Sequence, residues 1–556
     1  MKKILLSLFV VLGLTFAVSC IEVVNPQNST ITEEQAGNAP GAYNNFVSAI
    51  TSTLVGQFTY SGTSHTPYDY GYPSFFLMRD VMGNDIPLSY SGHWYQTWYT
   101  SHYALGPGYA VSQYPWTYYY KWIKNCNTVL SIAGDTPDAD KITGAGIAYA
   151  MRAMFYMDLA RMYAQKTYGI AKDSETVPIL TEKTTVLETA HNPRATNEVM
   201  WNFIISDLNK AEEYLATYDR SDVYTPNKSV VYGLKARAYL VMEDWANAER
   251  YAKLAQAGYT IMTESEYTSR VDGFNKPNSS WMFGLTFKST DPNILENDGD
   301  SSWGSFMCLE VNPTVSGCGY ASNYGQPPII DRHLYETMPA TDFRKKCFVD
   351  FALDNLSRAA CITALGAYSD YPEWIYLTGY NATYGAVGGL SLKFRLAGGS
   401  AGHDNQYIGF TVAVPLMRVE EMYLIEAEAA GMQSQSRGID LLTTFAKKRD
   451  ASYVYGSHNE AYGNSSTSAF QNEVWWHRRV EFWGEGFATF DIKRLNKGII
   501  RSYANTNHLP TNRWNTAAPP DWMNLCIVQT ETNYNTDCTN NPVPIKPATD
   551  SPEYPF

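Results

Sequence analysis

The chain has 556 residues, of which 45% are hydrophobic and 17% charged, so it can bury a large core and lacks the composition of a disordered or fibrous protein. Its 42 basic residues are outnumbered by 55 acidic ones, and the net charge of −13 argues against nucleic acid or an anionic membrane surface as partners. Aromatic residues make up 14% of the chain, and 42 of them are tyrosines. Because tyrosine and tryptophan join an apolar ring to a polar group, this excess indicates either a wet binding surface or a tyrosine-rich core.

The first twenty residues have the pattern of a bacterial export signal. Two lysines precede an apolar stretch over residues 4–18, which ends in small residues before Cys20. This stretch is short for a membrane span and resembles a lipoprotein signal, so we expect residues 1–19 to be removed and Cys20 to carry lipid. An ordinary signal peptide cleaved nearby is the alternative. No later stretch is long and apolar enough to span a bilayer as a helix, so lipid would hold the mature chain at a membrane face.

After a leader over residues 20–41, segments with helical spacing of apolar residues alternate with long stretches rich in tyrosine, glycine, asparagine and serine. The helix that opens at Thr196 has a capping hydroxyl, and Thr225 with Pro226 reads as a cap and first turn for the next helix. The spacing predicts helices at residues 43–54, 118–132, 146–163, from 196 onward, a hairpin over 230–255, and helices at 415–432, 439–449 and 470–482. The segments 56–116 and 260–410 and the tail 496–556 are expected to be mostly irregular.

The hairpin over 230–255 looks like a tetratricopeptide repeat. Two antiparallel helices approach closely only over small residues, and this segment places alanines and a tyrosine at the required spacing. Lys235 replaces the usual leucine and Glu243 the usual turn glycine. Because such repeats are stable when they stack, the neighbouring helices are expected to pack on this hairpin. The residues that carry the pattern are Ala236, Tyr239, Ala248, Ala252 and Ala255.

Seven cysteines remain after Cys20, and an exported chain can form disulfides. The short spacings make Cys308 with Cys318 and Cys526 with Cys538 the plausible pairs. Cys126, on an apolar helical face, is expected to be a small core residue. No cysteine lies in a CxxC or CxH spacing, so zinc and thioredoxin-like chemistry lack support, and we expect no metal and no cofactor.

An enzymatic alternative needs two carboxylates placed as acid and base on a glycosidic bond. The four glutamates at 420, 421, 426 and 428 mark out no pair, and the last two fit solvated or capping roles. Glu481 and Glu485 are one helical turn apart, and their neighbours Arg478 and Arg479 favour a buried structural ion-pair network over catalysis. No GxSxG, HExxH or Walker loop occurs in a suitable setting. We therefore expect a protein that is not an enzyme.

Several segments resemble the SusD/RagB family of outer-membrane nutrient-uptake lipoproteins. The strongest match is residues 478–494, where RRVEF, EG and FDIKR follow the late family signature RRxEL…EG…FDLxR, with Ala488 replacing its usual arginine. Residues 418–430 (RVEEMYLIEAEAA), 120–130 (YKWIKNCNTVL) and 146–163 are similar to three family helices. The resemblance covers nearly the whole chain.

The resemblance implies a mostly α-helical fold in which tetratricopeptide-like helix pairs, an α/α superhelix, scaffold an irregular, loop-rich ligand-binding part. The helix pairs would lie mainly in 118–258 and 415–495 of a single domain over 42–556, and the binding loops in 56–116 and 260–410. It also implies a cell-surface lipoprotein of the outer membrane that captures a nutrient, most often a glycan, for a SusC-like TonB-dependent transporter. A peptide ligand is the alternative within the family, and a surface glycoside hydrolase the alternative outside it.

Candidate binding residues follow from what a glycan requires. Sugar rings present flat CH faces edged with hydroxyls, so a site needs exposed aromatic rings with amide, carboxylate or guanidinium groups beside them. The early loop offers Trp94 and Trp98 as stacking platforms, with Arg79 or Asp80 as the polar partner. Alternatively, Trp94 and Trp98 are buried together on one helical face. Rings from separate loops that converge on one surface would favour a ligand site. The full candidate set is Arg79, Asp80, Tyr90, Trp94, Tyr95, Trp98, Trp303, Tyr320, Tyr324 and Trp374.

Overall fold

The computed structural model describes residues 41–57, 68–89, 91–101, 103–295, 302–314, 319–382 and 386–556. The predicted signal peptide, the lipidation site Cys20 and the leader lie outside these residues, as do Tyr90 and Cys318. Within the described residues, no helix has both the length and the apolar character needed to cross a membrane.

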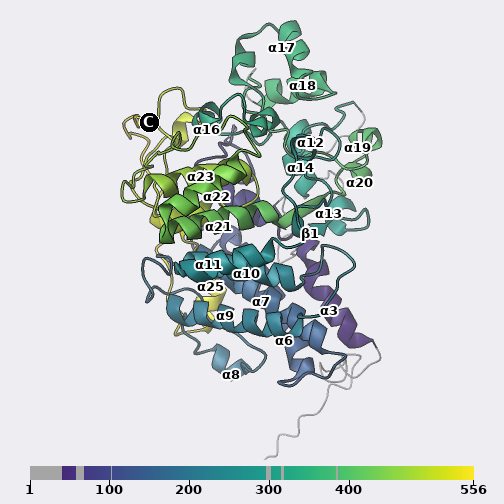
Figure 1. Cartoon of the computed structure of the whole chain (residues 1–556), viewed down its shortest axis with the longest axis vertical. Helices are drawn as coiled ribbons and strands as arrows, with labels where there is room; N and C mark the ends of the chain where they lie inside the picture. Colours follow the sequence, from purple (N-terminus) through teal and green to yellow (C-terminus); the bar gives the residue numbers. More distant parts are fainter. Residues whose placement is uncertain are drawn as a thin grey trace, which may run out of the picture.

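The fold is mostly α-helical, and its long helices stack on one another in succession. Each helix packs on the next, from α6 and α7 through α9, α10, α11 and α21 to α22 and α23, and Figure 1 shows the later members of this stack as rows from α9 upward. This arrangement confirms the predicted superhelix of tetratricopeptide-like pairs. The scaffold helices are α3 (Ala42–Ser52), α6 (Ala110–Ala133), α7 (Ile142–Tyr163), α9 (Asn197–Tyr214), α10 (Lys228–Met242), α11 (Trp245–Ala255), α21 (Val419–Gln433), α22 (Gln435–Ala446) and α23 (Ala469–Glu481).

The hairpin of α10 and α11 has the expected repeat geometry. Ala248, Ala252 and Ala255 are fully buried, so the two helix backbones approach closely. The Tyr239 ring stacks on Tyr251 with 5.6 Å between ring centroids. α21 and α22 approach even more closely, because a Cβ atom on Gly438 would lie only 2.3 Å from Cα of Gly431.

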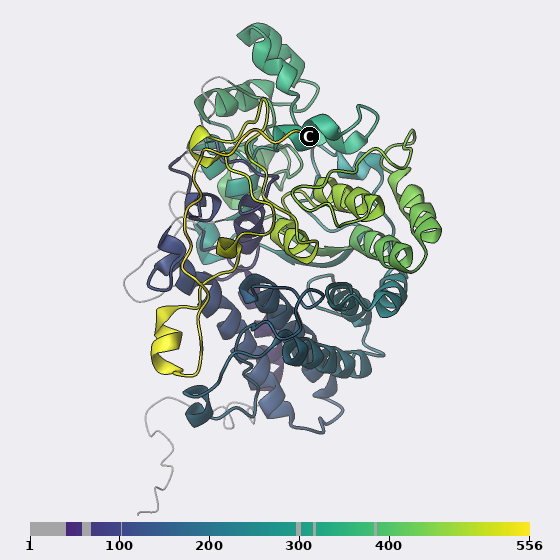
Figure 2. The same cartoon turned by 90° about the vertical axis from the view of Figure 1, so that its left-hand side faces the viewer.

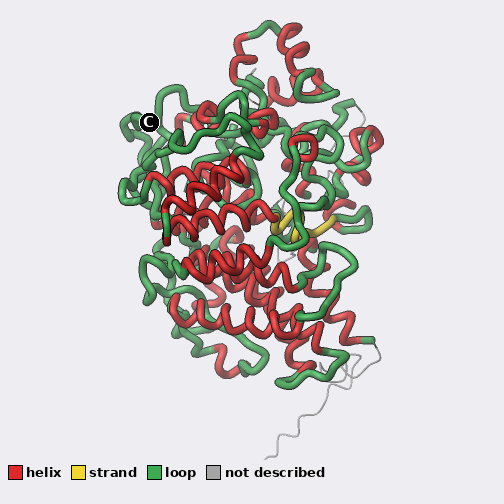
Figure 3. The backbone as a smooth tube through the Cα atoms, viewed as in Figure 1, coloured by secondary structure: helices red, strands yellow, loops and turns green. Residues whose placement is uncertain are grey.

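Short elements make up the rest of the chain, mainly around the upper half of the molecule in Figure 3, where loops predominate. The short α-helices are α4 (Ser74–Val81), α5 (Gln96–Tyr99), α8 (Val186–Thr189), α12 (Glu264–Tyr267), α13 (Pro292–Leu295), α14 (Trp303–Met307), α15 (Tyr320–Asn323), α16 (Arg332–Thr337), α17 (Arg358–Leu365), α18 (Pro372–Ala382), α19 (Ser400–Asp404), α20 (Gln406–Gly409), α24 (Ala488–Arg494) and α25 (Gln529–Tyr534). The 3-10 helices are η1 (Thr53–Val55), η2 (Tyr103–Leu105), η3 (Phe343–Cys347), η4 (Phe351–Asn355), η5 (Pro510–Asn512) and η6 (Asp521–Met523).

Two strands, β1 (Trp281–Thr286) and β2 (Ala413–Arg418), form an antiparallel pair in the described chain. They join the points where the chain leaves and re-enters the helical stack. The prediction of a helix beginning at residue 415 was wrong, because the start of that segment pairs with β1. Helix α10 begins at Lys228, after Asn227 caps it by accepting a hydrogen bond from the Val230 N–H at 3.1 Å, so Thr225 and Pro226 are not its first residues.

The aromatic surplus serves packing to a large extent. Many tyrosines of the early irregular segment are buried in one large core beside α6 and α7, among them Tyr70, Tyr72 and Tyr95. A second, smaller core that includes Ala321 and Ile375 joins α15 to α18. Most of the tyrosine excess in this segment therefore belongs to a tyrosine-rich core.

The C-terminal tail runs over the surface of the helical body, as the yellow segment in Figure 2 shows. The backbone N–H of Leu525 donates to Met162 O at 3.0 Å, and that of Tyr554 donates to Ser502 O at 2.8 Å. The proposed pairing of Cys526 with Cys538 is wrong, because both thiols are free and buried. The Cys526 thiol instead donates to the carbonyl of Pro542 at 3.4 Å. Cys126 is a free, buried core residue as expected.

Candidate functional site

Aromatic side chains from two loops far apart in sequence meet beside α5. The backbone N–H of Trp94 donates a hydrogen bond to the hydroxyl of Tyr320 at 2.9 Å. Tyr320 is itself buried, and its backbone N–H is held by Ser305 Oγ at 2.7 Å at the start of α14. This contact fixes the backbone of the early loop against α15, so the two segments share one surface.

Two rings extend from this junction into solvent. Trp94 is 46% exposed and Tyr324 is 49% exposed. The Tyr324 ring lies on Tyr320 with 6.0 Å between centroids and 32° between planes, and Tyr320 in turn packs on Phe306 at 4.6 Å. The Tyr324 ring is thus an exposed ring backed by buried ones, and such a ring costs little conformational entropy when it binds a ligand.

Two uncharged polar side chains lie beside Tyr320 and Tyr324. His93 packs edge-on against Tyr320 at 5.1 Å, and its Nδ1 accepts from the Tyr95 N–H at 3.1 Å. Burial lowers the pKa of His93 to about 3, so its imidazole is uncharged near neutral pH. Gln326 is buried, and its Nε2 reaches the carbonyl of Tyr324 at 3.4 Å. We name the group of Trp94, Tyr320 and Tyr324 the aromatic platform.

Trp374, another of the candidate residues, lies on a neighbouring element, α18. Trp374 is half-buried at the start of α18, and its ring stacks on Tyr371 with 4.3 Å between centroids and 13° between planes. Tyr371 also contacts the His403 ring at 4.2 Å. α18 packs on α15, so Trp374 belongs to the element that supports Tyr320.

Other candidate rings are buried in the core and are not accessible to a ligand at the surface. Trp98 and Tyr95 are 0% exposed, and Trp303 is 1% exposed. The Tyr95 hydroxyl donates to Ser74 O at 3.1 Å, and Trp303 packs against Phe394 with 5.2 Å between centroids. Because the chain turns sharply into the single helical turn of α5, Trp94 and Trp98 point to different environments. The two tryptophans are therefore neither a pair of exposed stacking platforms nor a pair buried together on one helical face.

Arg79 and Asp80 are buried as well, against the loop that follows α23. Arg79 Nε donates to Gly486 O at 2.8 Å, and its guanidinium lies over the Phe490 ring at 4.7 Å. The Asp80 carboxylate accepts from the N–H groups of Gly486 at 2.9 Å and Ala488 at 3.1 Å. Both side chains therefore join two distant parts of the core, and neither is the polar partner of a surface ligand.

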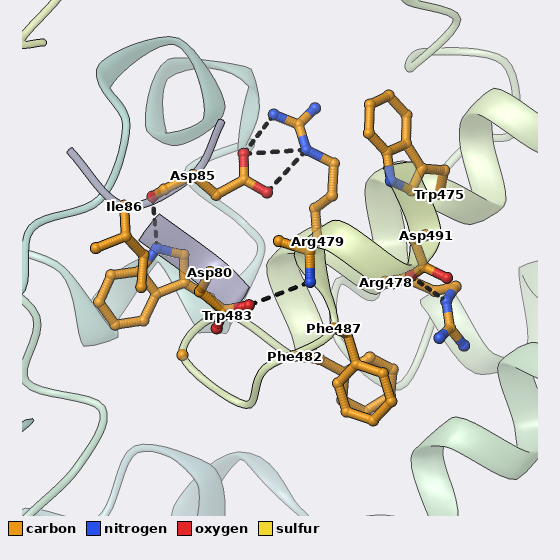
Figure 4. A pocket seen from close by; sticks show the side chains of 12 residues that line it. Asp80, Asp85, Ile86, Trp475, Arg478, Arg479, Phe482, Trp483, Phe487 and Asp491 are labelled. Carbon is orange, nitrogen blue, oxygen red and sulfur yellow. Dashed lines mark hydrogen bonds and ion pairs between the residues drawn. The ribbon is translucent and has the colours of Figure 1, made fainter. Parts of the chain in front are cut away.

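Figure 4 shows the surroundings of Asp80, where the signature arginines meet the early loop. Arg479 donates to Asp85 with a shortest contact of 2.6 Å, and Arg478 donates to Asp491 at 2.7 Å. The cavity among these residues has a volume of about 20 Å³. Such a cavity holds about one water and no sugar ring, so this cluster is structural.

The carboxylates considered for catalysis are also buried in ion pairs. Glu481 contacts Arg449 at 2.9 Å, Arg418 at 3.1 Å and Arg344 at 3.2 Å, and Arg418 also contacts Glu485 at 2.8 Å. The predicted buried network is therefore confirmed, but its partners are wrong, because the neighbouring Arg478 and Arg479 bind other carboxylates.

The expectation for the second pair of glutamates on α21 was wrong. Glu428 is 1% exposed and contacts Arg494 at 2.5 Å, and the buried Glu426 accepts from Gln256 Nε2 at 2.6 Å. Neither is solvated or capping. In the described part of the chain, no group of three His, Cys, Asp or Glu side chains is placed to hold a metal ion.

Sequence reasoning missed the residues that position the platform. Gln326 and His93 lie beneath Tyr324 and Tyr320, but isolated polar residues of this kind give no local signal. Tyr371 was also missed, although it lies just before α18 and three residues before Trp374, on which its ring stacks.

Comparisons with known proteins agree with this architecture. Residues 80–240 match a family described as starch-binding associating with outer membrane, and residues 379–545 match the SusD family. A SusD-like protein of Formosa agariphila, P38, is 22% identical over 417 residues, covering 71% of this chain and 74% of that protein.

Solved structures share the fold over nearly the whole chain. A SusD-like carbohydrate binding protein from Bacteroides vulgatus has a TM-score of 0.69 at 21% identity and covers 90% of this chain and 97% of its own. Surface glycan-binding protein A from Bacteroides thetaiotaomicron, in complex with laminarihexaose, has a TM-score of 0.61 at 16% identity, covering 90% of this chain and 98% of its own. The two matched family segments together make up more than half of the chain and flank the loop-rich region, and the chain belongs to the SusD/RagB family.

Proposed function

We propose that this protein is a cell-surface lipoprotein that captures a glycan on the aromatic platform and delivers it to a SusC-like TonB-dependent transporter of the outer membrane. The observation that carries this proposal is that two exposed aromatic residues from segments far apart in sequence contact the buried Tyr320, Trp94 through its backbone N–H and Tyr324 through its ring. Convergent exposed rings with neutral hydrogen-bonding groups beside them suit the flat faces and hydroxyl edges of sugars.

The family relationship supports this choice of ligand. One matched family is described as starch-binding, and a protein with the same fold is known in complex with laminarihexaose. Glu481, Glu485 and Glu428, which were considered for catalysis, are buried in ion pairs with arginines, and we propose capture without catalysis. Trp374, on the element behind Tyr320, is a further candidate for ligand contact.

Calorimetry with the mature chain in detergent solution tests glycan capture. The ligands are neutral and acidic polysaccharides and a peptide digest, and the variants are Trp94→Ala and Tyr324→Ala. We expect saturable binding of one glycan, weakened at least tenfold in each variant, because a buried face of a tryptophan or tyrosine often dominates a binding site.

Tyr534→Ala is the matched control, because this ring is 51% exposed on a different element, α25. Thermal unfolding of each variant shows whether the fold is retained. Binding of peptides alone would contradict the glycan assignment. Glycan binding that survives both platform substitutions would place the ligand elsewhere on the molecule.

Anchoring and delivery are tested in cells. If Cys20 carries the lipid, Cys20→Ser should shift the protein from the membrane fraction to the soluble fraction without changing its glycan affinity. Affinity purification of the wild-type protein from outer membranes should recover a TonB-dependent transporter. Retention of the serine variant in the membrane, or recovery of no transporter, would contradict the corresponding part of the proposal.

A further inference from the structure

Two adjoining surface hollows lie away from the residues of the aromatic platform. The first has a volume of about 520 Å³ and lies between α3, the loop before α10 and the end of β1. The second has a volume of about 360 Å³ and lies between residues 271–277 and the backbone at Gly398 and Gly399. Both volumes fall in the range typical of small-molecule pockets, roughly 300–1,000 Å³.

The two hollows share a wall made of Tyr224 and Thr286. The Tyr224 hydroxyl is hydrogen-bonded to the Thr286 side chain, and burial raises the pKa of this phenol. The two hollows therefore make up a groove that this half-buried tyrosine divides. We call it the Tyr224 groove.

Tyr224 is held rigidly, as a binding residue should be. Its backbone N–H donates to Asp222 Oδ1 at 2.8 Å. The adjacent carbonyl of Val223 accepts from the Gly284 N–H of β1 at 3.0 Å. On the other side, Arg220 Nη1 donates to the carbonyl of Thr225 at 2.9 Å. The loop is therefore tied both to the strand and to its own base, so its backbone does not need to be ordered on binding.

The lining of the groove selects for a neutral, hydroxyl-rich ligand. In the first hollow, Tyr218 provides a second ring, and Asp222, Asp291 and Lys288 provide charges of both signs. In the second, Asp272 and Lys276 form an ion pair at 2.8 Å. Carboxylates and ammonium groups in near balance hydrogen-bond sugar hydroxyls, whereas the carboxylates disfavour acidic ligands.

We propose that the Tyr224 groove is a second binding site for a neutral oligosaccharide, separate from the aromatic platform. One sugar ring would stack on Tyr224, and neighbouring units would occupy the hollows on either side of it. A chain captured at one site could then be held at both, which raises the effective affinity for long glycans without any new contact at the platform.

The test uses the mature chain carrying Trp94→Ala and Tyr324→Ala, which removes the platform. The probes are maltohexaose, laminarihexaose, cellohexaose, xylohexaose and mannohexaose. Saturation-transfer NMR detects the binding of each probe, and titration gives its affinity. We expect at least one probe to bind this double variant. Adding Tyr224→Ala should weaken that binding at least tenfold, whereas Tyr224→Phe, which keeps the ring, should change it less than threefold.

Ser48→Trp is a second, independent variant, because Ser48 is exposed on α3 and a large ring there fills the first hollow. Ser48→Trp should weaken probe binding at least tenfold, as Tyr224→Ala does, whereas Tyr534→Ala should leave the affinity unchanged. Thermal unfolding verifies that each variant folds. The proposal is overturned if no probe binds the double variant, or if its binding is insensitive to both Tyr224→Ala and Ser48→Trp. The function proposed for the platform is judged separately, by the loss of affinity between the wild type and the double variant.

Discussion

Glu243, at the turn between α10 and α11, has a backbone conformation that glycine adopts most readily. Its φ angle is +58°, in the left-handed region, and it closes α10 by donating its N–H to Leu240 O at 3.3 Å. A residue with a Cβ atom is strained there, and glycine is the residue most often found at such a helix end. The turn therefore keeps the geometry of a tetratricopeptide repeat even though its usual glycine is absent.

Glu243→Gly should stabilise the protein by roughly 0.5–1 kcal/mol, because glycine relieves the strain of the positive φ angle. Glu243→Ala is the matched control, since it also removes the carboxylate but keeps the Cβ atom. Urea unfolding of the three proteins gives the free energies. A glycine variant no more stable than the alanine variant would show that the strain at this turn is negligible.

Lys235 illustrates a different departure from the repeat. The tetratricopeptide repeat usually has leucine here, and Lys235 is 1% exposed between α9 and α11. Its ammonium donates to Asn209 Oδ1 at 2.7 Å, pairs with Glu212 and lies 4.7 Å from the centroid of the Tyr251 ring. The long side chain fills the position of the leucine and carries its charge to partners on both neighbouring helices. The repeat pattern identifies Lys235 as an exception, but the residues that stabilise its buried charge lie on other helices.

At the scale of elements, the helix α21 continues the stack directly after α11, although the whole loop-rich region separates them in sequence. Local periodicity predicts helices such as α11 and α22, whose buried residues lie on one face, whereas α7 and α21 are buried on nearly all sides. It does not predict β1 or β2, since a strand pair depends on partners far apart in sequence. The aromatic platform could not be predicted fully for the same reason. Tryptophan and tyrosine content identifies candidate residues, but only the tertiary packing determines that Trp94 is exposed and Trp98 is buried.

The arginine cluster around Glu481 holds α23 against β2 and the end of α22. Glu481→Gln should destabilise the protein by about 3–5 kcal/mol, because it removes the negative charge that pairs with three buried guanidinium groups. The control is Glu249→Gln, which breaks the pair with Arg437 at 2.6 Å, where the Arg437 side chain is half exposed. We expect that change to cost less than about 1 kcal/mol. Denaturant unfolding of both variants measures the difference, and equal losses would contradict a structural role for the Glu481 cluster.

At the scale of the whole molecule, several histidines are buried without a charge. Burial lowers the pKa of His93 to about 3 and that of His458 to about 4. It also lowers the pKa of His477 well below its usual value, with the nearby Arg344 acting in the same direction. In the unfolded chain these groups bind protons below about pH 6.5. The unfolded state therefore holds more protons than the folded state between that pH and the folded values. The stability that these uncharged histidines contribute is fully present above about pH 6.5 and is lost as the pH decreases through this window.

His458→Phe isolates one of these contributions. The imidazole of His458 stacks on Trp476 with 3.5 Å between ring centroids and 1° between planes, and a phenyl ring can keep this stack without taking up a proton. Between pH 7.5 and 5.5 the variant should lose about 1 kcal/mol less stability than the wild type. Glu473 accepts a hydrogen bond from the backbone N–H of His458 at 2.9 Å, and burial raises its pKa. Because Glu473 is present in both proteins, its own titration cancels in the comparison. His191→Phe, at an exposed position, controls for the loss of an imidazole. Urea unfolding at the two pH values gives the difference, and an identical pH dependence in wild type and His458→Phe would show that His458 gains its proton equally well in the folded and unfolded chains.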